Sequence, residues 1–511
     1  MVEYVTDPRH SQLLPRWIFL RLLGIVYLSA FGSLWFQVDG LIGSQGIVPV
    51  DALFEQIRSR SPSMSFWNFP TLSWLSTSDR MLHGQCIAGL LFSLFLILGM
   101  LPLLSVIVLW GLYLSLSTTG NIFFQFQWDT LLLEAGLLSV LVAPHGLRDA
   151  FPLHGQLGRL VPWEIPKWLF RWLLFRLIFF AGVVKLTSGD PSWRNLSALE
   201  YHFQTQPLPV WTSWYAHQLP LWIHHLGVLM VFIVELLLPW FIFGSRKMRK
   251  IAFVGINILQ LMIAVTGNYG FFNFLTSSIT IWLLDDSMFG ARWSERVHKQ
   301  ASSHPTFLKK WIRATVLIWV GLVAVVSGEH IRQTLFASAS GPVITRGAIR
   351  YVYNHVKPFR SINRYGLFAV MTTRRDEIVI EGSIDGRVWK EYEFFWKPGV
   401  SDRRPAFTGL HMPRLDWRMW FASLRDDPPS WYFRFVHRLL EGSAPVDQML
   451  YPNLFSGQVP RFIRGFRYEY RFARSGTADW WQRDKPRSYG PVMQLDQMGN
   501  LQEAKLPGHD E

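Results

Sequence analysis

The first candidates for chemistry are polar residues inside a long apolar segment. Residues 121–144, NIFFQFQWDTLLLEAGLLSVLVAP, carry Gln125, Gln127 and the two acids Asp129 and Glu134. An ionised side chain at the centre of a bilayer costs about 2.5 to 3.5 kcal/mol on insertion scales, so we expect these acids to be paired or protonated. At about 100° per residue, Gln127 and Glu134 fall on one helix face and the other two fall on nearly the opposite face. We therefore expect protein on all sides of this helix.

A basic residue in the next apolar segment is a possible partner for these acids. Arg176 lies near the middle of residues 167–187, which we expect to run antiparallel to residues 122–143. We predict an ion pair between Arg176 and either Glu134 or Asp129. The predicted buried polar layer comprises Gln125, Gln127, Asp129, Glu134, Arg176 and Glu235. We favour a structural role in helix packing for this layer, with a substrate or proton site as the alternative.

Lys185 is the candidate for catalysis. It lies nine residues beyond Arg176, about 13 Å along a helix, where we expect it to approach Gln125 and the start of the next span. A partly desolvated lysine can act as a base, but a lysine at this depth can also extend its charge to the membrane surface. The aromatic loop of residues 188–220 is expected to cover this end as a lid. The outer-face candidates are Lys185, Asp190, Trp193, His202, Tyr215, His217 and His224, and their histidines lack a metal-binding spacing.

The apolar segments predict the framework that positions these residues. Half of the 511 residues are hydrophobic, with 25 Trp and 39 Phe. A helix needs about 20 apolar residues to span a bilayer. Nine segments approach that length, so we predict a polytopic α-helical membrane protein with about nine transmembrane helices, near residues 17–38, 82–101, 103–118, 122–143, 167–187, 221–243, 251–267, 271–285 and 311–328.

Basic residues between the spans predict the orientation. Arg246, Lys247, Arg249 and Lys250 follow the sixth span, and a second basic cluster occupies residues 292–310. Such clusters stay cytoplasmic, which places the amino terminus inside and the chain after about residue 329 outside. Much of the net charge of +14 lies in these loops, and no nucleic-acid partner is expected. The single Cys86 excludes a disulfide in the outer part; we favour a bacterial inner membrane, or an endoplasmic reticulum membrane in a eukaryote.

The composition changes after the last span. Residues 365–373 and 377–396 are rich in β-branched and aromatic residues, with a turn signal at Asp385-Gly386. We predict a transmembrane domain over residues 1–328, an extracytoplasmic β-rich domain over residues 329–475 and a flexible tail over residues 476–511.

One segment of this outer part combines charges with large aromatics. Residues 411–424, HMPRLDWRMWFASL, contain Arg414, Asp416, Trp417 and Trp420. Three interpretations remain open for them: a surface that binds a partner, a platform that docks the domain on the membrane or the bundle, and packing inside the domain. No nucleophile elbow, phosphate-binding loop or internal repeat is present in the sequence.

Several stretches together resemble the lipase maturation factor family. They include FLRLLGIVYLSAFGSLWFQVDGLIGSQGIVPV, the opening NIFFQFQWDTLLLEAGLLSVLVAP, TGNYGFFNFLTSSITIWLLDD and PRLDWRMWFASL. The resemblance implies a polytopic membrane protein whose eukaryotic relatives reside in the endoplasmic reticulum and help dimeric lipases to fold and assemble. The expected partners are membrane lipid and an exported client protein, such as a lipase, and no cofactor is expected.

A shorter stretch supports an alternative. FAGVVKLTSGDPSW resembles the membrane segment of vitamin K-dependent gamma-carboxylases, in which a lysine deprotonates the quinol. The matching residue is Lys185. This resemblance implies a membrane enzyme that uses a quinol or another lipid as cofactor, whereas the first implies a chaperone-like factor, which we favour.

Overall fold

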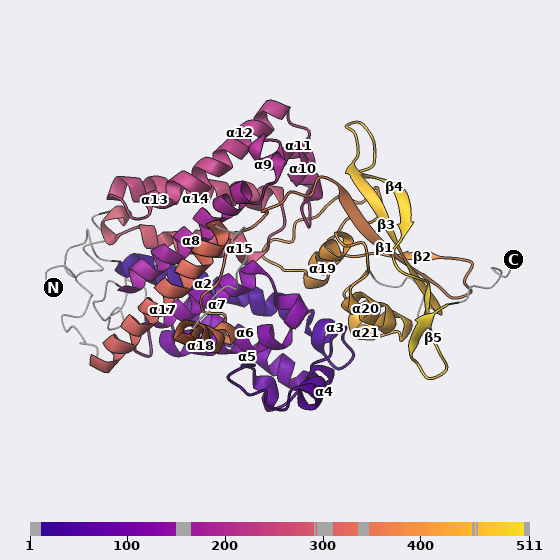
Figure 1. Ribbon diagram of the computed structural model, residues 1–511, viewed down its shortest axis with the longest axis horizontal. Helices are drawn as coiled ribbons and strands as arrows, with labels where there is room; N and C mark the ends of the chain where they lie inside the picture. The colour runs from indigo at the N-terminus through magenta and orange to yellow at the C-terminus, as the bar shows by residue number, and fades with distance from the viewer. Residues whose placement is uncertain are drawn as a thin grey trace.

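The computed structural model describes residues 12–149, 165–290, 293, 310–335, 347–451, 455 and 458–504. Residues 294–309, which contain part of the second basic cluster, lie outside this set, as do residues 505–511 of the predicted tail. A helical bundle forms one end of the molecule and a β-sheet forms the other, with helix α19 (Arg414–Ser423) between them (Figure 1).

Six helices of the described residues are long and apolar enough to cross a membrane. They are Leu13–Trp35 (α2), Asp79–Leu98 (α5), Pro102–Thr119 (α6), Leu221–Phe241 (α12, π-helical turn η3 and α13), Arg246–Thr266 (α14) and Val316–Thr334 within α17 (Lys310–Leu335). These six spans make the chain a multi-pass membrane protein. The other three predicted spans are also helical, but they differ in length or charge from ordinary spans.

Each of these three has a physical reason to differ. Helix α7 (Gln127–Val140) has only 14 residues, because residues 121–124 form a separate 3-10 turn, η2 (Asn121–Phe124). Helix α8 (Ile165–Thr187) is 23 residues long but carries four cations, Lys167, Arg171, Arg176 and Lys185. Helix α15 (Phe271–Thr280) spans ten residues and continues as a 3-10 turn, η4 (Ile281–Leu283).

Helices α2 and α5 pack closely because glycines lie at their contact. A Cβ atom at Gly89 of α5 would lie 2.4 Å from the ring of Phe31 on α2, and one at Gly24 would lie 2.8 Å from Ile97. Such approaches are typical of small residues at helix contacts in membranes. This pair supports α6 and α7, which carry the first polar cluster described below.

The loop between α8 and α12 is helical. It forms α9 (Pro191–Arg194), α10 (Ala198–Thr205) and α11 (Trp211–His217), which lie where the bundle meets the sheet (Figure 1). On the amino-terminal side, α3 (Val38–Ile42) and α4 (Val50–Arg60) connect α2 to α5.

The sheet is antiparallel and has six strands, in the order β2-β1-β3-β5-β6, with β4 also paired to β3. The strands are β1 (Arg375–Ser383), β2 (Lys390–Tyr392), β3 (Phe462–Phe472), β4 (Trp481–Ser488), β5 (Met493–Leu495) and β6 (Leu501–Glu503). The central pair runs from Arg375 opposite Tyr470 to Ser383 opposite Phe462. Helices α19, α20 (Ser430–Leu440) and α21 (Ala444–Asp447) complete this part.

The prediction of a flexible tail from residue 476 is wrong for the described residues. Strands β4, β5 and β6 all lie in that segment, and Trp481 of β4 is 1% exposed against Phe472 of β3. Polar composition suggested mobility, but backbone pairing with β3 and one buried residue, Trp481, are sufficient to place β4 in the sheet.

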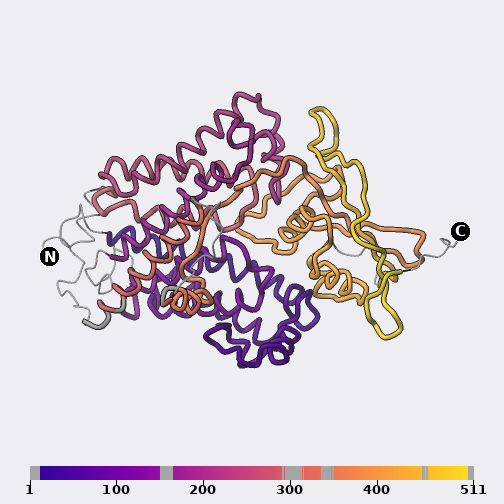
Figure 2. The backbone as a smooth tube through the Cα atoms, viewed as in Figure 1, coloured from indigo at the N-terminus to yellow at the C-terminus, as the bar shows by residue number. Residues whose placement is uncertain are grey.

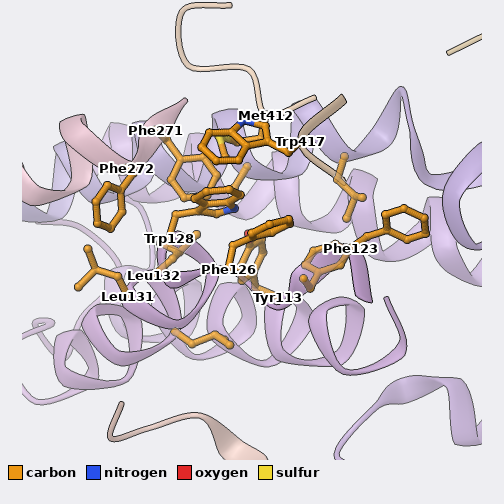
Figure 3. Close-up of a cluster of buried hydrophobic side chains, with 14 of the residues drawn as sticks. Tyr113, Phe123, Phe126, Trp128, Leu131, Leu132, Phe271, Phe272, Met412 and Trp417 are labelled. Carbon is orange, nitrogen blue, oxygen red and sulfur yellow. The ribbon is translucent and has the colours of Figure 1, made fainter. Parts of the chain in front are cut away.

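The segment that precedes the sheet returns to the bundle. Residues 357–374 follow α18 (Gly347–Val356) and begin with the 3-10 turn η6 (Lys357–Phe359). The tube in Figure 2 passes along the helices before it enters β1. Arg360 donates to the carbonyl oxygen of Phe124 at 2.9 Å on this path. The bundle and the sheet domain also share one continuous apolar core, in which Phe126 and Trp128 contact Trp417 (Figure 3).

Candidate functional site

The first polar cluster joins the bundle to α19 through a buried ion pair. Arg414 Nη2 lies 2.8 Å from Asp129 Oδ1, and Arg414 Nη1 lies 3.1 Å from Asp129 Oδ2. The Tyr113 hydroxyl donates to Asp129 Oδ1 at 2.5 Å, and Arg414 Nη1 donates to the Phe123 carbonyl at 2.6 Å. The side chains of Arg414 and Asp129 are 1% and 0% exposed. A bidentate pair of this kind is geometrically specific as well as strong.

Ser33 of α2 and Gln37, which lies between α2 and α3, hold the backbone that places Arg414 at this position. Ser33 Oγ accepts a hydrogen bond from Met412 N at 2.9 Å, and Gln37 Oε1 accepts one from Arg414 N at 2.8 Å. Gln37 Nε2 also donates to the Met412 carbonyl at 2.9 Å. These bonds hold the start of α19 next to Ser33 and Gln37, and from there the Arg414 side chain reaches Asp129.

The second cluster is centred on Glu134 and contains the predicted ion pair. Arg176 Nη2 pairs with Glu134 Oε1, which confirms the expected partner. The other carboxylate oxygen accepts from Asn363 N at 3.0 Å, Asn363 Nδ2 at 3.1 Å and the Tyr365 hydroxyl at 2.8 Å. Arg176 Nη1 donates to the Asn363 carbonyl at 3.0 Å. Glu134 thus binds the returning segment as well as α8.

The two glutamines occupy different positions. Gln127 forms a pair of hydrogen bonds with the backbone of Gly366, at 2.7 Å to its oxygen and 3.1 Å from its nitrogen. Gln125 is exposed and lies before α7, so its assignment to the buried layer is wrong. The helix starts late because the carbonyl groups of Phe123 and Phe124 accept hydrogen bonds from arginines instead of continuing the helical ladder.

The third cluster pairs Lys185 with Glu235. Lys185 Nζ lies 2.8 and 3.0 Å from the two Glu235 oxygens and 3.1 Å from the Ala181 carbonyl, so these three contacts use its three donors. Glu235 lies in the π-helical turn η3, whose wider hydrogen bonding fits Pro239, because proline has no N–H to donate to the carbonyl of Glu235. The expected contact of Lys185 with Gln125 is therefore wrong. Its partner is Glu235, which the sequence analysis had assigned to the buried polar layer.

Of the other outer-face candidates, Trp193 and His202 lie near Lys185, and the others make their contacts elsewhere. Trp193 lies under its ammonium group, with Nζ 5.2 Å from the ring centroid. Burial lowers the pKa of His202 to about 4, with a contribution from the charge of Lys185. His224 Nε2 contacts the Ala216 carbonyl at 3.0 Å, and Tyr215 is exposed. His217 lies against Phe472, and in the described parts of the chain no three His, Cys, Asp or Glu side chains are placed to hold a metal ion.

The loop of residues 188–220 connects the bundle to the sheet domain. Asp190 accepts a hydrogen bond from Met371 N, and Trp193 Nε1 donates to the Phe368 carbonyl at 3.0 Å. Arg375 at the start of β1 donates to three carbonyl groups of the loop at 2.8, 2.5 and 3.0 Å, those of Gln204, Gln206 and Pro207. This loop was predicted as a lid, but these contacts make it a fixed connection.

The residues predicted as a possible partner surface, Arg414, Asp416, Trp417 and Trp420, are buried. Asp416, Trp417 and Trp420 are 3%, 4% and 7% exposed, so they cannot form an open binding face. The ring of Trp417 packs on Trp128 of α7 at 4.7 Å, and Trp420 Nε1 donates to the Thr205 carbonyl at 3.0 Å (Figure 3). Burial raises the pKa of Asp416 to about 6, although its carboxylate accepts N–H bonds from Trp396 and Lys397. These contacts correspond to docking on the bundle.

The sequence analysis did not identify several residues of these clusters. Tyr113, Asn363 and Tyr365 complete the shells of Asp129 and Glu134, and Gln37 positions Arg414. For the pair of Asp129 with Arg414, the only signals in the sequence were an acid without an assigned partner in an apolar segment and an arginine among large aromatics. Chemically, the three clusters bind structural elements to one another by paired charges that are withdrawn from solvent.

Comparison with known proteins covers both parts of the chain. The model of the lipase maturation factor transmembrane domain matches residues 14–291, and the model of the lipase maturation factor C-terminal domain matches residues 361–491. Lipase maturation factor 2 of Rattus norvegicus is 34% identical over 95% of this chain and 84% of its own length. Lipase maturation factor 1 of Homo sapiens is 30% identical over 95% of this chain and 88% of its own length. No solved structure matches the chain.

Proposed function

Because the chain belongs to the lipase maturation factor family, we propose that it is a membrane-embedded factor for the folding and assembly of an exported client, with a lipase as the first candidate. The names of its relatives state the client class, and the similarity extends over both the bundle and the sheet domain.

The single observation that carries this proposal from the structure is the locked junction. Asp129 pairs with Arg414, and Glu134 binds Asn363, so the sheet domain is fixed to the membrane bundle by buried charges. A rigid platform of this kind suits a factor that presents a folding surface at the membrane, because a fixed geometry lowers the entropy cost of binding a client.

The proposed topology follows from the basic residues between spans. Residues 246–250 lie on the cytoplasmic side in this proposal, and the sheet domain lies outside the cytoplasm, in a bacterial inner membrane or in the lumen of the endoplasmic reticulum. The topology counts about nine helices that cross the membrane. Reporter enzymes fused after residue 244 and after residue 504 should report opposite sides, and the same side for both would contradict the topology.

The function is tested in the native host. A deletion strain should secrete less active lipase, or less of a small set of exported proteins, than the wild type at equal transcript levels. Lys185→Arg at a matched membrane level should restore secretion, because arginine can keep the charge opposite Glu235 but stays protonated and cannot act as a base. Loss of secretion in Lys185→Arg, with normal accumulation of the variant, would contradict the assembly role and favour base catalysis. Lys185→Met is the matched control, since it removes the charge.

A further inference from the structure

An exposed aromatic surface lies where α11 meets the sheet domain, away from the three polar clusters. It is formed by Trp211 and Tyr215 of α11 and by Phe407 of the loop before α19, and we call these three residues the α11 surface. The ring centroid of Trp211 lies 6.0 Å from that of Tyr215 and 6.0 Å from that of Phe407. Tyr215 is 56% exposed and Phe407 is 40% exposed. Contiguous exposed apolar groups mark a surface that binds a protein or a membrane.

Hydrogen bonds fix α11 to the ends of two membrane spans. The Thr212 hydroxyl donates to the carbonyl group of Val265, the residue before the last of α14. His224, in the first turn of α12, contacts the Ala216 carbonyl at 3.0 Å. Helix α11 is therefore held at the ends of α12 and α14 that face the sheet domain (Figure 1).

The loop that carries Phe407 is held at the same level. Asn268, which follows α14, donates to the Ala406 carbonyl at 2.8 Å and accepts from Thr408 N at 2.8 Å. These two bonds enclose Phe407 on both sides. The sheet domain therefore presents this ring beside the end of a membrane span.

The lipid-facing side of α12 leads directly to the α11 surface. An exposed apolar stripe runs along this helix and its π-helical turn, and it comprises Trp222, Leu226, Leu229 and Ile233. Their spacing of three or four residues places them on one face. Trp222 at the start of α12 is 66% exposed, and Val265 at the end of α14 is exposed at the same level. Because such a stripe faces hydrocarbon, its end marks the level at which hydrocarbon meets water.

The residue types of the α11 surface fit this level. Trp and Tyr concentrate at membrane interfaces, because their rings are apolar and their N–H and O–H groups reach water. The exposed Arg404 adds a cation, and its guanidinium carbon lies 5.9 Å from the centroid of the Trp211 ring. We propose that the α11 surface binds the phospholipid headgroup region of the membrane that holds the spans, so that Phe407 anchors the sheet domain to the bilayer. This contact fixes the height of the domain above the lipid and does not depend on the identity of the client.

The test is a depth measurement on the full-length protein in phosphatidylcholine vesicles. Cys86 is the single cysteine of the sequence and is buried, so the unsubstituted protein is the blank for labelling with a fluorescent maleimide. Tyr215→Cys and Phe407→Cys place the fluorophore on the α11 surface. Met498→Cys, in the exposed turn between β5 and β6 far from α11, is the control in water (Figure 1). Ile258→Cys, on the exposed side of α14 near its middle, is the control in hydrocarbon.

Two quenchers locate each fluorophore. A lipid with a nitroxide on its headgroup should quench Tyr215→Cys and Phe407→Cys at least about threefold more than Met498→Cys, and iodide in the water should quench them about threefold less. A nitroxide deep in the acyl chain should quench Ile258→Cys most strongly.

Two outcomes would overturn the proposal. Labels at Tyr215→Cys and Phe407→Cys that behave like the label at Met498→Cys would show that the α11 surface is open to water and available to a protein partner. Lipid quenching at Tyr215→Cys alone would show that the sheet domain does not reach the bilayer. If Phe407→Cys fails to accumulate, Ala406→Cys at its exposed neighbour replaces it. The vesicles contain no client, so neither outcome bears on the proposed role in client assembly.

Discussion

Asp129 and Arg414 form a bidentate, fully buried ion pair although 285 residues separate them in the chain. Asp129 belongs to the membrane bundle and Arg414 opens the helix that supports the sheet. The pair therefore turns a polar residue in an apolar segment into the attachment point of a second domain. The guanidinium group also donates to the Tyr113 hydroxyl at 3.1 Å, and its carbon lies 3.7 Å from the centroid of the Phe124 ring, so these two side chains help to cover the pair from solvent.

Removing one partner of this pair should be far worse than removing both. Arg414→Met leaves a buried carboxylate without its counter-charge, and we expect a loss of about 3 to 5 kcal/mol in the free energy of unfolding. Asp129→Leu combined with Arg414→Met should recover most of that loss. Thermal unfolding in detergent, together with the amount of protein in the membrane, measures both effects. Arg418→Met is the control, because it loses a 3.3 Å contact with exposed Gln125 and the contact of its guanidinium with the Phe126 ring but no ion pair with Asp129. Equal losses in all three variants would contradict this role for the pair.

The hydroxyl of Tyr113 should contribute a smaller, separable amount. Tyr113→Phe removes the 2.5 Å hydrogen bond to Asp129 Oδ1 and the 3.1 Å bond that the Tyr113 hydroxyl accepts from Arg414 Nη2, so we expect a loss of about 1 to 3 kcal/mol in the free energy of unfolding. Tyr27→Phe is the matched control, because that buried hydroxyl lies 3.5 Å from the Leu132 carbonyl and makes only a weak contact. Similar melting temperatures for the two variants would show that the Tyr113 contact is not stabilising.

The sequence predicted contacts between neighbouring helices better than contacts between domains. Arg176 and Glu134 lie on helices that are adjacent in the chain, so their depth in the membrane could be compared directly. For Arg414 the sequence leaves a partner surface, a docking platform and packing inside the domain open, because nothing in it indicates which distant segment this residue faces. Gln125 was assigned to the buried layer because hydropathy extends the predicted helix back to residue 122. In the structure, arginines donate to the carbonyl groups of Phe123 and Phe124, and the helix begins only at Gln127.

Glu134 should control the order of the returning segment. Glu134→Gln removes the charge that pairs with Arg176 and weakens the acceptor of the Asn363 and Tyr365 hydrogen bonds. We expect proteolytic cleavage within residues 357–374 to become at least several-fold faster, since local opening then costs less. Glu329→Gln, which breaks an exposed pair with Arg332, should leave the cleavage rate unchanged. Unchanged cleavage in both variants would show that the segment is held by its apolar contacts alone.

The raised pKa of Asp416 predicts the direction of one pH effect. Its pKa is about 6 in the folded protein and 3.8 in the reference state, so the folded state binds the proton more tightly. Its contribution to stability is therefore most favourable below about pH 4 and is lost as the pH rises through 6. Asp416→Asn should remove this dependence, so the variant should gain stability relative to the wild type at pH 7.5 and much less at pH 4.5. Melting temperatures of both proteins at the two pH values measure this difference, and an equal difference at both pH values would show that Asp416 does not titrate in this range.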